Sequence, residues 1–148
     1  MMPIRKKDWF KRLINYVQTH IQTPFKYGEF DCCLFACDAV IEMTGKDPAI
    51  RYRGKYSTKR GALKALKSIG GGSIESAFTK MFGDMDVPLS AMRGDVVLVE
   101  TEQGPAAAVY LGANNVAAAS EAGVIYLPFS SIQGVWHIDN LEVSLCLQ

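Results

Sequence analysis

The amino-acid sequence predicts an α+β domain, and three observations lead to that prediction. Apolar residues recur at helical spacing up to about residue 92. Short runs rich in Val, Leu, Ile and Tyr, separated by turn residues, occupy residues 93–148. The length of 148 residues suits one domain with a single core. We therefore expect one domain, residues 1–148, in which a mainly helical half (1–92) packs on an antiparallel sheet (93–148).

Four helices are expected in the helical half. They cover approximately residues 8–19, 32–43, 58–68 and 73–82. The helix at 32–43 is apolar nearly all round, which is typical of a central buried helix. Asp31 is its natural N-cap and Gly45 its stop. Asp8 is the candidate N-cap of the first helix, and residues 47–56 between the second and third helices are predicted to form an ordered loop.

Five strands are expected in the second half. They cover approximately residues 96–100, 106–111, 115–119, 123–126 and 135–138. Because turn residues separate them closely, we predict an antiparallel meander on which the 32–43 helix packs.

Cys32 is the candidate nucleophile of this chain. It is expected in the first turn of its helix, just after a turn that contains Gly28. The free N–H groups and partial positive charge of a helix N-terminus stabilise a thiolate and lower the pKa of a thiol there. A retained thiol without a catalytic role is the alternative, because a nucleophile also needs a base.

The other cysteines do not show the spacing of a metal site. Cys33 and Cys37 lie in the same predicted helix and are expected to pack as small apolar side chains. Adjacent residues on a helix diverge by about 100°, so Cys32 and Cys33 should point apart. No C-x-x-C pair is present, and Cys146 is distant. We therefore predict no metal site, no cofactor and reduced thiols, with a thiolate metal site as the weaker alternative.

Charge and hydropathy exclude two classes of partner. Sixteen basic and fifteen acidic residues leave a net charge of +1, which gives no general attraction for nucleic acid. No apolar run is long enough to cross a bilayer, and the N-terminus lacks the apolar region of a secretory signal. We expect synthesis in the cytosol and contact with neither nucleic acid nor membrane.

Two separated motifs resemble the NlpC-type papain-like peptidases, which cut bacterial peptidoglycan stem peptides. Asp31-Cys32 resembles the family's Asp-Cys-Ser-Gly start of the nucleophile helix. The segment 93–99 (RGDVVLV) resembles its Gly-Asp-Leu-Val-Phe strand, and 108–112 (AVYLG) its Val-Gly-Ile-Tyr-Leu-Gly strand. The resemblance implies a papain-like (NlpC-type) domain, with N-terminal helices packed on a C-terminal antiparallel β-sheet.

The spacing of motifs in the first seventy residues resembles a narrower family. These are small uncharacterised proteins, distantly related to the NlpC type, whose genes are typical of the tail modules of tailed phages and prophages. The matching segments are 24–32, 35–40, 44–45 and 53–56. The resemblance implies a role in a phage tail.

The family's catalytic partners do not carry over. The resemblance places its general-base histidine on Ala106 and its orienting polar residue near Ala118. Both are expected to face the Cys32 helix, and a methyl group can neither accept a proton nor hold an imidazole. The two histidines of the chain, His20 and His137, are the remaining candidate bases, with His137 expected on the last strand. A structural place is the alternative for each, because catalysis requires hydrogen-bond reach to the thiol.

These inferences lead to an expected function and location. We expect a structural or assembly component of a phage or prophage tail tip, without hydrolase activity, located in the virion tail after synthesis in the bacterial cytoplasm. Its partners would be other tail or baseplate proteins, contacted through the C-terminal region or the 47–56 loop. The alternative is an active cysteine peptidase or amidase that cleaves peptidoglycan during genome entry, with Cys32 as the nucleophile.

Overall fold

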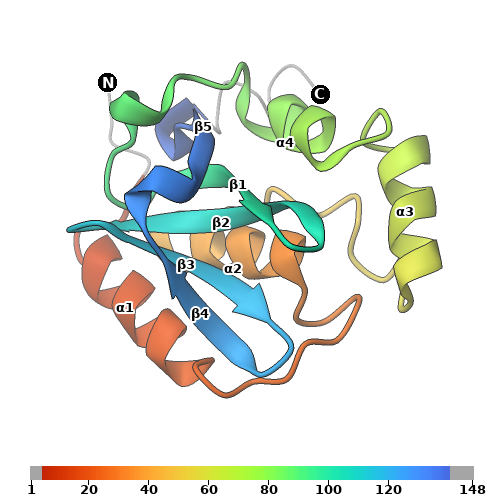
Figure 1. The fold of residues 1–148 in the computed structure, drawn as a ribbon, viewed down its shortest axis with the longest axis horizontal. Coiled ribbons are helices and arrows are strands. Elements are labelled where there is room, and N and C mark those ends of the chain that lie inside the picture. Colours follow the sequence, from red (N-terminus) through yellow and green to blue (C-terminus); the bar gives the residue numbers. More distant parts are fainter. Residues whose placement is uncertain (1–4, 141–148) are drawn as a thin grey trace.

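The computed structural model describes residues 5–140, which form a five-stranded antiparallel sheet with helices packed against it (Figure 1). The helices are α1 (Trp9–Thr19), α2 (Cys32–Thr44), α3 (Lys59–Ser68) and α4 (Ile74–Phe82). The strands are β1 (Val96–Thr101), β2 (Gly104–Gly112), β3 (Asn115–Ser120), β4 (Gly123–Leu127) and β5 (Ile132–Trp136). Three 3-10 turns follow α4 or flank β5: η1 (Pro88–Ser90), η2 (Phe129–Ser131) and η3 (Ile138–Asn140). The α+β prediction is confirmed.

Helix α2 is the central helix, as its apolar sequence predicts. It lies behind β2 and β3 in Figure 1 and packs on both strands and on α1. Phe35, Ala36 and Val40 are among its fully buried residues. The Asp31 carboxylate caps its first turn, and Gly45, with a φ of 79°, ends it in the left-handed conformation that glycine adopts without strain.

The other predicted helices are also present, with different ends. Thr58 caps α3 and Ser73 caps α4, and the side chain of each accepts the backbone N–H of the third helical residue. Asp8 precedes α1 but makes no capping hydrogen bond with its side chain. Its carboxylate instead accepts from Arg12 Nε at 2.8 Å, one turn further along the helix.

The strand order β4-β3-β2-β1-β5 departs from a simple meander at its last member. Strands β1 to β4 follow one another, but β5 returns to the opposite edge and pairs with β1. The predicted last strand, 135–138, is wrong in position, because β5 ends at Trp136 and His137 follows it. The backbone N–H of Ile138 turns to the Asp95 carboxylate, which takes the chain out of the ladder.

The two faces of the sheet carry separate apolar clusters. Ala107, Val109 and Ala117 belong to the main core, which includes the α2 side chains. Ala108 and Ala118 belong to a second cluster on the other face. Successive residues of a strand alternate between faces, so each of these strands contributes to both clusters.

No helix within residues 5–140 is long and apolar enough to cross a membrane.

Candidate functional site

The turn that carries Cys32 is held by one buried carboxylate. Asp31, which is 3% exposed, accepts from the N–H of Leu34 at 2.9 Å through Oδ1. Its Oδ2 accepts from the N–H of Gly28 at 3.0 Å and from the hydroxyl of Tyr56 at 2.6 Å. Gly28 has a φ of 87°, and a Cβ there would collide with the carbonyl oxygen of Tyr56. The sequence pattern Gly-x-x-Asp-Cys therefore fixes Cys32 at the helix N-terminus, as predicted.

The Cys32 thiol has a pKa below its ordinary value. A hydrogen bond with the Cys33 thiol lowers this pKa most, burial raises it, and a backbone hydrogen bond from Ala107 lowers it again. The nearby Asp31 carboxylate raises it. The same pairing and burial raise the pKa of Cys33 well above its usual range. The lower pKa of the pair therefore belongs to Cys32, and a thiolate is favoured there rather than on Cys33.

The two adjacent cysteines do not point apart, which corrects the sequence prediction. Their sulfur atoms are 3.9 Å from each other, and both residues are partly exposed. The 100° divergence applies to Cβ directions around the helix axis. Side chains also tilt toward the helix N-terminus. The sulfur of a cysteine lies one bond beyond Cβ, so the sulfurs of Cys32 and Cys33 can still turn toward each other.

Ala107, rather than Ala106, is the β2 residue that meets the Cys32 helix. The prediction that Ala106 and Ala118 face α2 is wrong, because both pack with the cluster on the opposite face of the sheet. Ala107 and Ala117 face α2, and Ala119 packs against the same cluster. A shift of one residue reverses the face in a strand, so the positions transferred from the family motif are one residue out of register. The residues on the α2 side of both strands at this level are still alanines.

His20 occupies a structural position at the end of α1. Its Nδ1 lies 3.0 Å from Thr23 Oγ1. Its ring packs between Tyr16 and Phe30, with centroid distances of 4.9 and 5.3 Å. No hydrogen bond or ring contact found in residues 5–140 joins it to Cys32.

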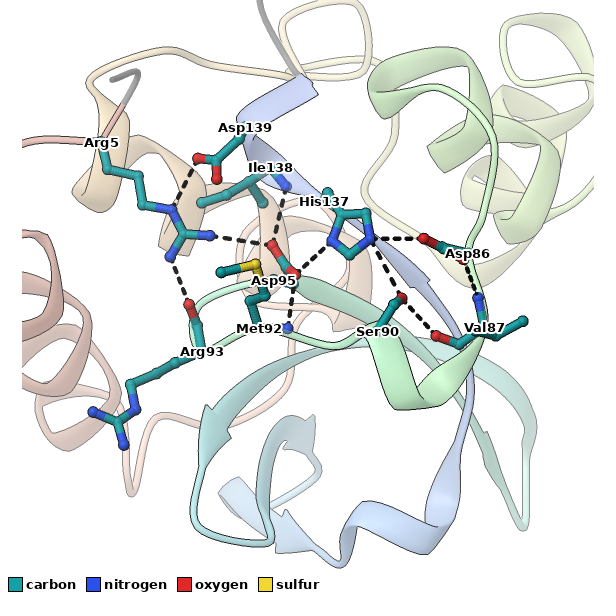
Figure 2. A network of polar contacts seen from close by, with 10 residues as sticks. All are labelled: Arg5, Asp86, Val87, Ser90, Met92, Arg93, Asp95, His137, Ile138 and Asp139. Atoms are coloured by element: carbon teal, nitrogen blue, oxygen red, sulfur yellow. Dashed lines mark hydrogen bonds and ion pairs between the residues drawn. The ribbon is translucent and has the colours of Figure 1, made fainter. Parts of the chain in front are cut away.

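His137 lies in a separate polar network, beyond the end of β5 (Figure 2). Its Nδ1 is 2.8 Å from Asp95 Oδ2, and its Nε2 is 3.1 Å from Asp86 Oδ2. Ser90 Oγ lies 3.3 Å from Nε2. Within the described part of the chain, no hydrogen bond or ion pair found joins His137 or these partners to Cys32.

Asp95 is the buried centre of this network. It is 1% exposed and accepts the backbone N–H groups of Met92 and Ile138 as well as a contact from Arg5 at 3.2 Å. The Gly94-Asp95 pair was visible in the sequence as part of a strand motif. The rest of the network was not identified, because His137 lies 42 residues from Asp95 and 51 residues from Asp86 in the sequence.

The two carboxylate partners of His137 favour its charged form. The Ser90 hydroxyl donates to the carbonyl of Val87 at 2.6 Å, so its single hydrogen is not directed at His137. A ring nitrogen needs a hydrogen to bond an ionised carboxylate, so the contacts of Nδ1 with Asp95 and of Nε2 with Asp86 are both satisfied in the protonated imidazole. Burial lowers the pKa of His137, but the hydrogen bonds to Asp95 and Asp86 outweigh it and raise this pKa overall. A charged imidazole between two carboxylates holds segments together and is a poor base.

An apolar cleft of about 390 Å³ lies at a different place, between α1 and the ends of β2, β3 and β4. Phe10, Leu111 and Tyr126 line it, and the guanidinium of Arg93 stands over the Phe10 ring at 4.7 Å. Cys32 is not among its lining residues.

Residues 5–140 contain no cluster of three or more His, Cys, Asp or Glu side chains suited to a metal ion. Cys37 is fully buried, with its sulfur 4.0 Å from the sulfur of Met81, so it lies in the core as predicted. Cys146 lies outside the described residues.

Comparison with known proteins gives one family and a fold. A family model described as a domain of unknown function, DUF6950, matches residues 4–138. No curated protein matches the chain. Among solved structures, the crystal structure of the NlpC/p60 domain of the peptidoglycan hydrolase SagA matches with a TM-score of 0.56 and 17% sequence identity. The match covers 86% of this chain and 97% of that one. At this identity the likeness concerns the fold, which confirms the predicted papain-like, NlpC-type architecture.

Proposed function

This chain belongs to the DUF6950 family of domains of unknown function, and we propose that it is a papain-like domain without hydrolase activity that serves in a phage or prophage tail tip. The observation that carries the loss of activity is the surroundings of Cys32. Ala107 lies against its sulfur, and Ala117 and Ala119 supply methyl groups on the next strand. A cysteine nucleophile needs a base in hydrogen-bond reach, and none of these side chains is one.

Exposed apolar side chains support a role in protein contacts. Val87, Leu89 and Met92, in and next to the η1 turn, are 63%, 89% and 59% exposed. Three large apolar side chains within six residues of an exposed segment are typical of a surface that another protein covers. In this proposal the partners are other tail or baseplate proteins, and the protein is located in the virion tail after synthesis in the bacterial cytoplasm.

A second candidate is an active cysteine peptidase or amidase acting on peptidoglycan. The lowered pKa of Cys32 and its place at a helix N-terminus favour it, because both increase the thiolate fraction. The solved structure with a similar fold is the domain of a peptidoglycan hydrolase. For this function His20 or His137 would have to leave its present partners and reach Cys32.

Hydrolysis of purified peptidoglycan stem peptides separates the two candidates. We expect the wild-type protein to release no more product than its Cys32→Ala variant at any pH between about 5 and 9. The NlpC/p60 domain of the hydrolase serves as the positive control for substrate and detection. Turnover by the wild type that disappears in Cys32→Ala would establish the second candidate.

The location is tested independently of the activity. Mass spectrometry of purified virions, or of induced tail particles from the host that carries the gene, should detect the protein at a fixed ratio to known tail proteins. Its absence from washed particles would reject the structural role and leave a factor that acts only during assembly.

A further inference from the structure

We propose that Cys32 and Cys33 together form a two-sulfur chelating site for soft, thiophilic acceptors, with trivalent arsenic as the defining class of ligand. The site consists of both thiols at the first turn of α2. It goes beyond the proposed function and does not depend on whether the domain hydrolyses peptides.

The separation of the two sulfurs fits a chelate. They are 3.9 Å apart, and both residues are partly exposed. A tetrahedral ion with metal–sulfur bonds of about 2.3 Å holds two of its sulfur ligands roughly 3.8 Å apart. Trivalent arsenic forms pyramidal bonds at narrower angles and so brings two sulfurs somewhat closer than a tetrahedral ion does. A small approach of the two sulfurs is therefore enough to place both on one arsenic centre. The third cysteine of the helix, Cys37, is fully buried and contributes to the core instead.

The surroundings of the pair favour a thiolate on Cys32 and hold the Cys33 thiol beside it. The Cys33 thiol is hydrogen-bonded to Cys32, and a backbone hydrogen bond from Ala107 reaches the same sulfur. The rigid turn around Asp31 fixes the start of the helix, with its carboxylate accepting three hydrogen bonds. Two soft sulfur ligands held in this way bind soft centres in preference to hard cations such as Mg²⁺.

The binding step needs no oxidant. In the reaction with phenylarsine oxide, the Cys32 thiolate attacks arsenic, and the Cys33 sulfur forms the second arsenic–sulfur bond. The oxygen of the reagent leaves as one water molecule with the two thiol protons. Arsenic remains trivalent and both sulfurs remain at the thiolate oxidation level.

Intact-protein mass spectrometry with phenylarsine oxide tests the site. It uses the full chain with Cys146→Ser, so that this cysteine cannot take part. We expect one reagent per protein, with the mass of the reagent minus one water, located on the peptide that contains residues 32 and 33. A dithiol competitor should remove the adduct, whereas an excess of a monothiol should not, because only a dithiol can replace both bonds of a chelate.

Three variants complete the test. Cys32→Ser and Cys33→Ser should each lose the adduct that resists monothiol, while Cys37→Ala should retain it as the matched control. Far-ultraviolet circular dichroism confirms that each variant is folded before it is used. The proposal is overturned if either serine variant keeps a monothiol-resistant adduct, or if the folded wild type forms none.

Discussion

At the residue scale, Asp31 has two opposing effects on Cys32. It accepts three hydrogen bonds and so holds the turn in which Cys32 begins α2. Its negative charge also raises the pKa of the Cys32 thiol, against the Cys33 hydrogen bond that lowers it. This buried carboxylate therefore fixes the position of the thiol while reducing its thiolate fraction.

We predict that Asp31→Ala destabilises the fold by about 2 kcal/mol or more, because it removes the helix cap and leaves the Tyr56 hydroxyl and two N–H groups without their acceptor. Urea denaturation measures this loss. Asp31→Asn is the matched variant, since its amide oxygen can still cap the helix. This variant should lose less stability than Asp31→Ala and should lower the pKa of Cys32. An equal loss of stability in the two variants would show that capping is unimportant here.

The second prediction concerns His137 and the pH dependence of stability. The pKa of His137 is raised in the folded protein, so the folded state binds this proton more tightly than the unfolded state. The resulting stabilisation is fully present below the unfolded pKa of about 6.5 and is lost as the pH rises through the folded pKa. His137→Gln should therefore cost on the order of 1–2 kcal/mol at a pH of about 6, and less at about 9.

Denaturant titrations of wild type and His137→Gln at both pH values measure this difference. His20→Gln is the control, because His20 has no carboxylate partner among its hydrogen bonds. The difference in free energy of unfolding between wild type and His137→Gln should shrink toward high pH. A difference that stays constant or widens would contradict the assignment of His137 as a cation between Asp95 and Asp86.

Sequence reasoning located Cys32 and Asp31 but not the role of His137, for a physical reason. The signals for Cys32 are local, since Gly28, Asp31 and the apolar helix lie within one short segment. The partners of His137 are 42 and 51 residues away in sequence. The pairing of β5 with β1 brings Asp95 to His137, and the bridge between Asp86 and Val135 brings Asp86 there. No local pattern indicates either pairing.

At the element scale, the register of β2 decides which alanine meets Cys32. Strand β1 pairs with β2 so that Leu98 opposes Ala107, and both belong to the α2 side of the sheet. The strand itself was predicted from its composition, because residues 106–111 carry the apolar run. The residues that this strand turns toward α2 were not predicted correctly. A run of three alanines has no alternation of polar and apolar residues to show which face is buried.

This register gives a third prediction. Ala107→Leu should destabilise the protein by roughly 1–3 kcal/mol, because Ala107 is fully buried against α2 and the added carbons have no space. Ala106→Leu is the matched control on the other face, where Ala106 is only partly buried, and it should cost clearly less. The midpoint of thermal unfolding is measured for both variants. A larger loss in Ala106→Leu than in Ala107→Leu would mean that β2 presents its other face to the helix.

At the scale of the whole molecule, the exposed apolar segment 87–92 lies beside the His137 network. Asp86 and Ser90 fix this segment to the sheet through His137, and the N–H of Asp86 pairs with the carbonyl of Val135. The exposed side chains of Val87 and Leu89 are thus presented by a fixed backbone. This segment was not among the contact regions expected from the sequence, which were the C-terminal region and the 47–56 loop. Residues 145–147 lie outside the described residues, and the loop stays a predicted contact region.

We predict that Leu89→Asp leaves stability unchanged and removes binding to the proposed tail partners. The side chain is 89% exposed, so the folded protein loses no packing, whereas an interface would have to bury an unpaired charge. Leu63→Asp on α3 is the control, because Leu63 is also exposed but far from this segment in the chain. Pull-down against purified tail proteins, with unfolding measured in parallel, checks the outcome. Equal binding by both variants would place the interface elsewhere.

The central claim is that no imidazole acts on Cys32, and the pH dependence of its alkylation by iodoacetamide tests it most directly. Cys33→Ser and Cys146→Ser in the background leave Cys32 as the reactive thiol, since Cys37 is fully buried. We predict a rate that rises with pH in one step, reporting the Cys32 thiolate alone, and that is unchanged by His20→Gln or His137→Gln. A thiolate that stays reactive below the pKa of a histidine, and loses that reactivity in either histidine variant, would contradict the account.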